Sequence, residues 1–424
     1  MKFIYKLLSL SLAIACLSGC SAANTEIASS SAATATVTPT TDSTEVPASN
    51  NVFTSAGDGL YVTTDSGIYE LQTVFPDSAN IFYTDANTKE RIFLCANPNC
   101  THADESCPSY IATPSAMFPP MLLRVGDQLL VVFTETTDSS NPHGMLMNMD
   151  GSNRRTVFEL ASNQYMQGGF CTSGNDLYFD LYEIDDSGNV TYQLWYVSFE
   201  NGTSEKVMDL GSDSDHYSLC DGANNELCFN HVSSDGISYC MYNPQSKTIS
   251  DPFFVDSSVS GNSMIQDGYL FVLDEQASSV QRIRLSDKEQ ASASFTVKEG
   301  FGAPSMRYLF DGNLMITEAQ TTASDIPTDG SYGVCSYILD FGTRNCTEFT
   351  LQTPYNNRPV YVLTTIGDAC YVATDYKTYT PTSVSEDGTV SNFDYVANIY
   401  AFITKQDYIN SNQNGYSMVK DAFE

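Results

Sequence analysis

The sequence is poor in positive charge. Lys and Arg together number 19 against 51 Asp and Glu, so the formal net charge of the 424 residues is −32. A chain this acidic repels nucleic acid and anionic lipid headgroups at long range, and we therefore expect no nucleic-acid partner and no electrostatic attachment to a membrane. The same charge keeps an exported surface protein soluble. Net charge alone does not identify a cation or a basic peptide as the ligand.

The sequence also lacks the short motifs of common catalytic sites. It contains no Gly-x-Ser-x-Gly elbow, no His-Glu-x-x-His pair and no Walker-type loop. Histidine is scarce, and His143, His216 and His231 stand isolated among the four. Paired carboxylates of the glycosidase kind could meet in space, but no spacing identifies them. We therefore name no catalytic or cofactor-binding residue and lean away from an enzyme.

Two polar segments contain possible metal ligands but have a simpler interpretation. Asp213, Asp215 and His216 offer carboxylate and imidazole groups, yet a turn between repeats explains them as well. Residues 185–189 look like a calcium loop without its regular alternation and terminal Glu. We interpret this second segment as a hairpin turn.

The N-terminal apolar stretch is too short to span a bilayer. Residues 1–19 combine Lys2 and Lys6 with an apolar run and a small-residue end, which is typical of an export signal. Leu17-Ser18-Gly19-Cys20 resembles the lipobox of bacterial lipoproteins. The resemblance implies cleavage before Cys20, a diacylglyceryl group on its thiol, and acyl chains such as palmitate that hold the mature protein on the extracellular face of the cell membrane. The alternative is an ordinary signal peptide that contains a Cys.

The next segment has almost nothing to bury. Residues 20–51 are rich in Ser, Ala and Thr, and we predict a disordered tether after the lipidated Cys20. O-glycans on this stalk are an alternative use of the same composition. Residues 52–424 then form one folded domain, with a Cys/His-rich insertion at about 95–118.

The folded part carries a degenerate internal repeat. Each copy begins with a turn rich in Gly, Asn and Asp, continues with apolar and aromatic residues, and ends with a strand, a polar turn and another strand. The first residues after the turns are Leu60, Leu129, Leu177, Leu227, Tyr269, Leu314 and Cys370. Their separations are 69, 48, 50, 42, 45 and 56 residues.

Repeats of this length with four short strands each are typical of propeller blades. One four-stranded sheet cannot bury both faces, whereas a ring of sheets buries each face against a neighbour. We therefore predict an all-β fold, a β-propeller with seven blades, and keep a pair of β-sandwiches as the alternative. The final repeat lacks a last strand after Ile403, and we expect residues 51–54 to supply it.

The longest repeat holds the densest chemistry in the chain. Cys95, Cys100, His102 and Cys107 follow the pattern Cys-x4-Cys-x-His-x4-Cys. Three thiolates and one imidazole are a standard tetrahedral set for structural zinc, and a metal held by four protein ligands has no open position for catalysis. The spacing is not a common finger spacing. A disulfide between two of the thiols, which an exported protein is free to form, and free thiols therefore stay open as alternatives.

This segment resembles one that recurs in propeller-type surface lipoproteins of Gram-positive anaerobes. The matching residues are Leu94-Cys95, Pro98-Asn99-Cys100, His102, Cys107-Pro108 and Tyr110. Repeats such as residues 147–153 are also similar to TolB-like and low-density-lipoprotein-receptor-type blades. The resemblance implies a propeller fold and a place on the cell surface, and it implies no particular ligand.

Seven further cysteines are scattered through the strand patterns. They are Cys171, Cys220, Cys228, Cys240, Cys335, Cys346 and Cys370. We expect them to act as small buried apolar side chains. Cys220 with Cys228, and Cys335 with Cys346, are near enough in sequence to bridge neighbouring strands, although connectivity cannot be read from sequence.

These observations favour a binding or scaffolding protein. A propeller offers a central funnel built from several blades, and 26 Tyr provide rings and hydroxyl groups for such a surface. We expect a glycan, a peptide or an envelope partner as the ligand. One alternative is an exported polysaccharide-degrading enzyme with paired carboxylates near the centre. A second is the substrate receptor of an importer, although the strands and helices that usually alternate in such receptors are missing from the pattern.

Overall fold

The structure is a computed structural model in which Glu45–Glu424 form one compact unit. It describes residues 53–55, 59–75, 78–113, 119–137, 140–256, 262–320, 333–379, 382–384, 390–392 and 395–422. The predicted signal, Cys20 and the linker 20–51 lie outside the described residues, as do residues 114–118 of the predicted insertion. In the described part, the α-helical structure is confined to α1 (Lys405–Ile409), and no helix there has the length and apolar character to cross a membrane.

The strands pair antiparallel and in chain order, sheet after sheet. The first sheet contains β2 (Tyr61–Thr63), β3 (Gly67–Phe75), β4 (Ser78–Asp85), β5 (Arg91–Phe93) and β6 (Tyr110–Ala112). The second contains β7 (Met121–Val125), β8 (Gln128–Phe133), β9 (His143–Asn148) and β10 (Arg155–Glu159). Each strand thus pairs mainly with the strand beside it in the sequence, as expected for blades built from hairpins.

The next two repeats share one ten-stranded sheet. Its strands are β1 (Thr54–Ser55), β11 (Gln164–Ser173), β12 (Asp176–Ile184), β13 (Val190–Ser198), β14 (Thr203–Ser212), β15 (Asp215–Ala223), β16 (Glu226–Ser233), β17 (Gly236–Asn243), β18 (Thr248–Ile249) and β19 (Phe254–Asp256). The two halves join where β14 pairs with β15 at Gly211 and His216. Because these repeats form one continuous sheet, the blade count of seven stays a prediction.

Three more sheets complete the domain. The first of them contains β20 (Ser263–Gln266), β21 (Tyr269–Asp274), β22 (Ser279–Arg284) and β23 (Gln290–Ser294). The second contains β24 (Phe301–Tyr308), β25 (Leu314–Gln320), β26 (Val334–Asp340) and β27 (Asn345–Phe349). The last contains β28 (Val362–Ile366), β29 (Ala369–Tyr379), β32 (Tyr395–Thr404) and β33 (Ser417–Met418), and a separate hairpin of β30 (Thr382–Val384) and β31 (Val390–Asn392) lies between β29 and β32 in the sequence.

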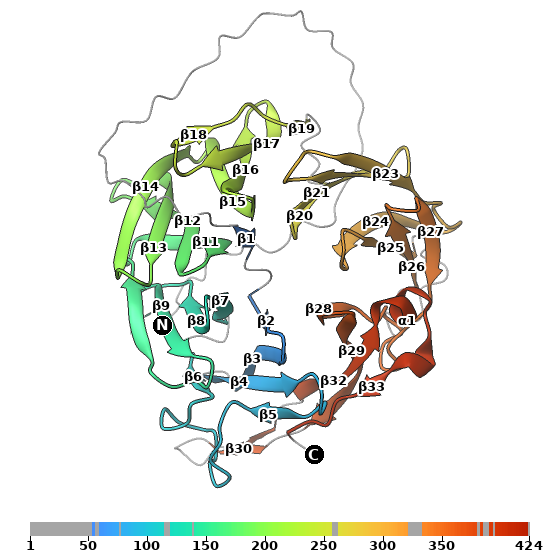
Figure 1. The fold of residues 1–424 in the computed structure, drawn as a ribbon, viewed down its shortest axis with the longest axis horizontal. Helices are drawn as coiled ribbons and strands as arrows, with labels where there is room; N and C mark the ends of the chain where they lie inside the picture. Colours follow the sequence, from blue (N-terminus) through green and yellow to red (C-terminus); the bar gives the residue numbers. More distant parts are fainter. Residues whose placement is uncertain are drawn as a thin grey trace, which may run out of the picture. The chain divides into compact units, whose positions relative to one another are not determined.

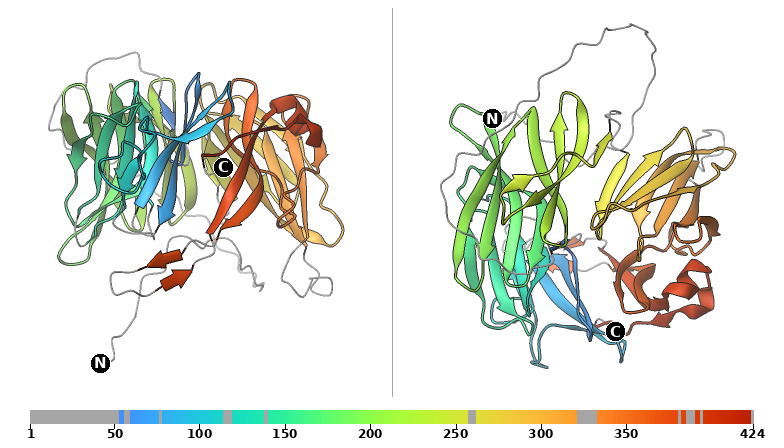
Figure 2. Two further views of the ribbon diagram at one scale, coloured as in Figure 1. Left: turned by 90° about the horizontal axis from the view of Figure 1, so that it is seen from below. Right: turned by 45° about the horizontal axis from the view of Figure 1, so that its top comes forward.

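The sheets stand around a common centre, with the first strand of a repeat toward the centre, except that β1 lies on the central side of β11 (Figure 1). Figure 2 shows from the side that the strands run roughly along the axis of this ring. The domain is therefore an all-β propeller, as the repeat predicted, and neither tandem sandwiches nor helices layered on a sheet are seen among the described residues.

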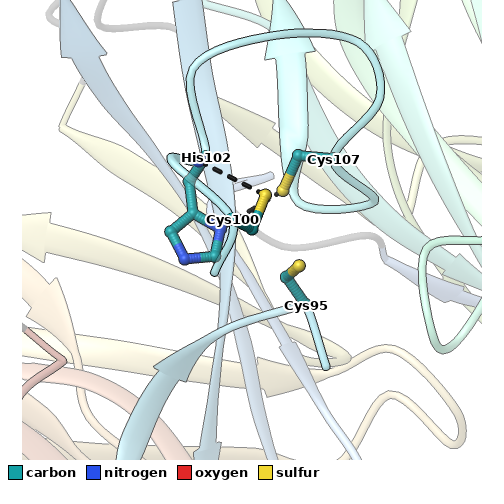
Figure 3. Close-up of side chains that lie close together, drawn as sticks. All are labelled: Cys95, Cys100, His102 and Cys107. Carbon is teal, nitrogen blue, oxygen red and sulfur yellow. Dashed lines mark hydrogen bonds between the residues drawn. The ribbon is translucent and has the colours of Figure 1, made fainter. Parts of the chain in front are cut away.

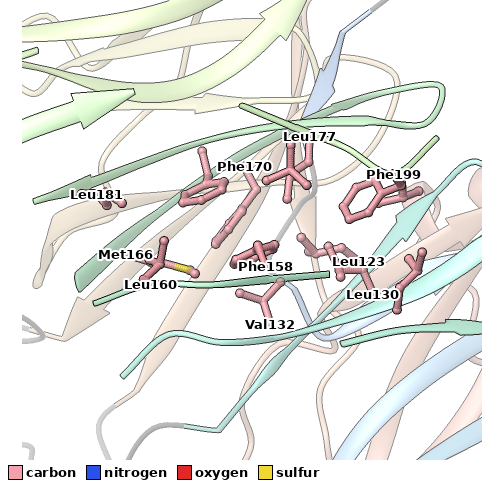
Figure 4. Close-up of a cluster of buried hydrophobic side chains, with 14 residues drawn as sticks. Leu123, Leu130, Val132, Phe158, Leu160, Met166, Phe170, Leu177, Leu181 and Phe199 are labelled. Carbon is pink, nitrogen blue, oxygen red and sulfur yellow. The ribbon is translucent and has the colours of Figure 1, made fainter. Parts of the chain in front are cut away.

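The hydrophobic core lies in the seams between neighbouring sheets. In one seam Leu123, Leu130 and Val132 of the second sheet pack against Phe170 and Leu177 of the ten-stranded sheet (Figure 4). The seam between the first and last sheets has its own buried cluster, in which Ile68 packs with Tyr371, Tyr400 and Phe402. Every sheet thus buries its faces against neighbours, which is the physical reason that the repeats form a ring.

The prediction of ring closure was wrong. Thr54 and Ser55 of β1 pair with β11, opposite Thr172 and Cys171, while Asn51 and Val52 lie outside the described residues. The last sheet is completed instead by β33, which pairs with Ala401 and Phe402 of β32.

The C-terminal chain reaches this position because it folds back after β32. The side chain of Tyr408 on α1 is fully buried, and its hydroxyl donates to Val360 O at 2.7 Å. This anchor holds the turn that returns the chain to the sheet edge. Beyond β33, Arg91 N donates to Lys420 O at 2.9 Å, which joins the end of the chain to the first sheet.

Candidate metal centre and central cavity

The Cys/His segment interrupts the outer strand of the first sheet. Strands β5 and β6 both pair with the same edge of β4. Leu94 N donates to Ile81 O at 2.9 Å, and Ile81 N donates to Ser109 O at 2.8 Å. Both ends of the excursion therefore meet at Ile81, and residues 95–108 loop out of a strand that continues on either side.

The loop brings together the four predicted ligands, Cys95, Cys100, His102 and Cys107 (Figure 3). Their ligand atoms, three Sγ and one ring nitrogen, lie within 4.8 Å of one another. Cys95 and Cys107 stand at the neck of the loop, and the other two come from its middle. His102 Nδ1 lies 3.3 Å from Cys107 Sγ. The predicted residues thus form a cluster that could hold a metal ion.

Local turns place these side chains. Cys100 N donates to Asn97 O at 3.2 Å, and Asn99 N donates to Asn97 Oδ1 at 3.1 Å, as in an Asx turn. His102 has a φ of +57°, and its ring stacks on Phe93 of β5 with 4.0 Å between the centroids. The left-handed backbone at His102 therefore turns the imidazole back toward the strand from which the loop started.

The environment differs between the two cysteines at the neck. Burial disfavours the thiolate of Cys107, but hydrogen bonds with Ser109 and His102 outweigh it and lower the pKa of Cys107 to about 6. Burial raises the pKa of Cys95 to about 11, and the neighbouring thiols Cys107 and Cys100 add to the increase. Three neighbouring thiolates repel one another, so Cys95, Cys100 and Cys107 can all be deprotonated only if a cation lies among them. A bound metal ion supplies that positive charge.

A second layer of groups supports the cluster. Cys107 Sγ lies 3.1 Å from Ser109 Oγ, and that hydroxyl donates to Asn80 Oδ1 on β4 at 2.8 Å. The side chains of Ser109 and Asn80 are buried. Outer groups of this kind orient metal ligands and tune their affinity. Three sulfurs, one imidazole and an ordered outer layer therefore fit the donor set of structural zinc.

Residues of the second sheet contact the C-terminal end of the loop. Arg154 Nη1 donates to Tyr110 O at 2.6 Å, and its Nη2 donates to Pro108 O. Gly151 also packs against this point, since a Cβ there would come 2.3 Å from Pro108 O. The loop is therefore fixed at its neck by the cluster and at its exit by the next sheet.

The other cysteines form no disulfide in the described residues, where every cysteine is free. The strand register explains why Cys335 and Cys346 do not bridge, because Cys346 faces Leu339 and Cys335 faces Glu318. Most of these cysteines are buried, as expected for small apolar side chains, although Cys346 is exposed.

The isolated histidines have local partners. His143 stacks on Phe133, His216 stacks on Tyr192, and His231 Nε2 lies 2.6 Å from Asp215 Oδ1. Asp213, Asp215 and His216 do not converge as a group of metal ligands within the described ranges. Asp185 accepts bonds from Ser187 N and Asn189 N at 2.8 Å, which confirms the predicted hairpin turn.

The sequence did not reveal which residues meet in the central cavity. This cavity has a volume of about 500 Å³ and lies among residues from strands or turns of five repeats. Its side chains include Tyr61, Tyr269 and Tyr308, the charged Asp221, Asp267 and Arg284, and the polar Asn224, Gln266, Ser286, Thr364 and Thr365. Several of these residues sit in or next to the repeat turns, which is the only signal in the sequence that relates them.

The carboxylates of the cavity take part in its construction. Asp221 is 1% exposed, and it accepts bonds from Gly222 N at 2.7 Å and from Gly268 N at 2.8 Å. The second bond crosses from the ten-stranded sheet to the turn before β21. Asp267 is exposed and accepts a bond from the hydroxyl of Tyr308. The two carboxylates thus differ, since one is buried in the wall and the other faces the open space.

No known protein family and no curated relative matches the sequence. Solved structures with a similar course of the chain include the tricorn protease (11% identity over 81% of this chain and 35% of that chain, TM-score 0.31). Another is the β-propeller domain of the Trilobed protease from Pyrococcus furiosus (12% identity over 72% of this chain and 99% of that chain, TM-score 0.36). A third is TolB from Acinetobacter baumannii (11% identity over 82% of this chain and 80% of that chain, TM-score 0.29). The chain spans about a third of the tricorn protease chain. At such low identity and TM-score, these neighbours say nothing about what this chain binds.

Proposed function

We propose that this protein is a lipid-anchored, extracytoplasmic β-propeller that binds a glycan, a peptide or an envelope partner in its central cavity. The anchor rests on the lipobox-like Leu17–Cys20 and on the linker 20–51 that follows it. The observation that carries the binding function is the cavity of about 500 Å³, whose tyrosines, amides and hydroxyls offer stacking and hydrogen bonds to a polar ligand.

Binding is favoured over hydrolysis by the state of the carboxylates. A glycosidase needs two carboxyl groups that act on one bond, one as acid and one as base or nucleophile. Asp221 already accepts two backbone N–H bonds and is 1% exposed, so it is poorly placed to reach a substrate. Asp267 accepts a phenol hydroxyl and faces the cavity without a second free carboxylate beside it in the described lining.

A polysaccharide-degrading enzyme is the second candidate, because Asp221 and Asp267 do line the same cavity as three tyrosines. The two candidates differ in the effect of Asp267→Asn. An enzyme would lose hydrolysis of its polysaccharide entirely, whereas a binding protein would release no reducing ends either before or after the substitution.

The Cys/His cluster has a structural part in this proposal. Zinc would be held by Cys95, Cys100, His102 and Cys107, and it would cross-link the neck and the middle of the loop that connects β5 to β6. Four protein ligands complete a tetrahedral shell, so the metal stabilises the fold and takes no part in a reaction. Metal analysis and thiol titration of the purified protein test this assignment, and a metal-free protein with oxidised thiols would contradict it.

The binding function is tested with the full-length protein in detergent against an array of glycans and cell-wall peptides. Thr365→Trp fills the cavity with a large ring, while Thr347→Trp makes the same change on the exposed outer strand β27. We expect a ligand that is lost in the first variant and retained in the second. A full array without any ligand, or a ligand that binds both variants equally, would place the function elsewhere.

The anchor is tested in cells. Cys20→Ala should move the protein from the membrane fraction to the medium, and it should abolish incorporation of a labelled fatty acid. Cys16→Ala, within the predicted signal, is the control that should leave both unchanged. Membrane retention of the first variant would contradict lipid anchoring at Cys20.

A further inference from the structure

One wall of the central cavity presents a carboxylate that is only partly used. Asp267 lies in the turn between β20 and β21 with a φ of +53°, and its side chain is exposed. The hydroxyl of Tyr308 donates to Oδ2. Oδ1 accepts no hydrogen bond from the part of the chain that the structure describes, and it is therefore available to a donor in the cavity.

Aromatic rings line the same cavity as this carboxylate. Tyr308 is tied to Asp267 through its hydroxyl, Tyr269 follows two residues later in the chain, and Tyr61 contributes from β2. The guanidinium of Arg282, which is not part of the cavity lining, already lies over the ring of Tyr269 at 5.0 Å from its centroid. Rings of this kind attract cations through their faces, and a carboxylate among them strengthens the attraction.

The cavity lining also has an excess of negative charge. Its charged side chains are Asp221, Asp267 and Arg284. Arg284 does not neutralise the other two, because its guanidinium pairs with Asp287 at 3.1 Å and with Glu289. Asp221, Asp267, Asp287 and Glu289 are four carboxylates against two guanidinium groups, Arg284 and the nearby Arg282, so negative charge is in excess. Such a site repels uronates, phosphates and other anions and attracts a cation.

From these three observations we infer that the cavity takes an amine-bearing saccharide, with its protonated amine on Asp267 Oδ1 next to the rings of Tyr269 and Tyr308. This inference rests on the proposed function, since it names the ligand class of the same cavity. The ammonium group supplies up to three donors to Oδ1 and the rings, while Gln266, Thr365 and other polar side chains offer partners for sugar hydroxyls. Binding of the amine is an ion pair with a hydrogen bond and involves no covalent step.

A matched pair of sugars tests the inference. The tetramers of glucosamine and of N-acetylglucosamine have the same backbone and differ in whether the nitrogen is charged. Binding of both to the full-length protein in detergent is measured by calorimetry at roughly pH 6, where such amines are protonated. We expect the glucosamine tetramer to bind about tenfold more tightly than the acetylated one, a difference of about 1.4 kcal/mol.

Two variants locate the effect. Asp267→Asn keeps an acceptor for Tyr308 but removes the charge, and it should abolish the preference for the amine. Asp311→Asn is the control outside the cavity: Asp311-Gly312 forms the corresponding turn of the next repeat with a φ of +53°, and its carboxylate pairs with Lys405 at 2.9 Å, so this variant shows the effect of losing a turn carboxylate that does not line the cavity. Melting temperatures of both variants show whether they fold.

The outcomes separate the inference from the proposed function. Equal binding of the two tetramers, or a preference that survives in Asp267→Asn, overturns the amine inference while the cavity remains a binding site. Binding of neither tetramer also overturns it. The proposed function itself fails only if the broader array of glycans and peptides yields no ligand that Thr365→Trp excludes.

Discussion

Removing the hydroxyl of Ser109 should weaken the metal centre without altering any of its four ligands. Ser109 is fully buried, and its Oγ lies 3.1 Å from Cys107 Sγ. It helps to lower the pKa of Cys107 to about 6, against the effect of burial, so its loss makes protons compete better with the metal for this thiolate. Groups in this position typically contribute 10–100-fold in metal affinity, or about 1.4–2.8 kcal/mol.

The same substitution should also lower the stability of the metal-free protein. While Cys107 is protonated, the one hydroxyl proton of Ser109 is free to donate to Asn80 Oδ1, whose residue is only 3% exposed. Ser109→Ala therefore leaves a buried carbonyl oxygen without this donor, at a cost of about 1–3 kcal/mol. Competition with a chromophoric chelator measures the zinc dissociation constant, and denaturant unfolding with and without zinc measures stability. We expect a dissociation constant roughly 10–100 times that of the wild type.

Ser106→Ala is the control for this experiment. The Ser106 hydroxyl bonds to the exposed carboxylate of Asp104 in the same loop and does not reach a ligand. Its removal should change the unfolding free energy by less than about 0.5 kcal/mol and leave zinc affinity unchanged. If both variants bind zinc as tightly as the wild type, the outer layer around Cys107 has no part in the site. If the wild type binds no zinc, the assignment of the metal centre is wrong.

Two further predictions concern buried charged groups. Arg91 is buried, and its guanidinium lies 2.9 Å from the carboxylate of Glu70, so Arg91→Ala should lower the free energy of unfolding by about 3–5 kcal/mol in chemical denaturation. The ion pair of Lys420 is exposed, and Lys420→Ala should lower it by less than about 1 kcal/mol. Similar losses in both variants would contradict this prediction. Burial raises the pKa of Asp180 to about 7, so the folded state keeps a proton that the unfolded state releases, and stability should fall as the pH rises from about 4 to about 7. Asp180→Asn should flatten that part of the stability profile, and an unchanged slope would show that another group causes it.

The fold was largely predictable because its information is local. The turn and the strands of each repeat are indicated by its own local sequence. In residues 174–179, for example, Gly174 has a φ of +57° in the turn, and β12 begins at Asp176. Burial of one sheet against the next then follows from composition alone. The cysteine cluster was predictable for the same reason, since its four ligands fall within one short loop.

Ring closure was not predictable, because it depends on contacts between the two ends of the chain. The sequence after Ile403 shows no strong strand pattern, and β33 has only two residues. Its place is determined by Tyr408, which is buried in the seam cluster with Phe310, Phe349 and Val360. A short polar strand gains stability there from the anchored turn before it and not from its own propensity.

The sequence by itself determined the repeat, the all-β character of the folded part and the Cys/His cluster, because each depends on residues that are close together in the chain. The expected export and lipidation also reside in one short segment, Leu17–Cys20. The central cavity was decided only by the tertiary structure. Tyr61 and Asp267 are 206 residues apart in the sequence, and Asp267 and Thr365 are 98 residues apart, so they line one cavity only when the ring closes. A binding surface built from one or two residues per repeat has no local pattern, since its chemistry exists only after the sheets have packed.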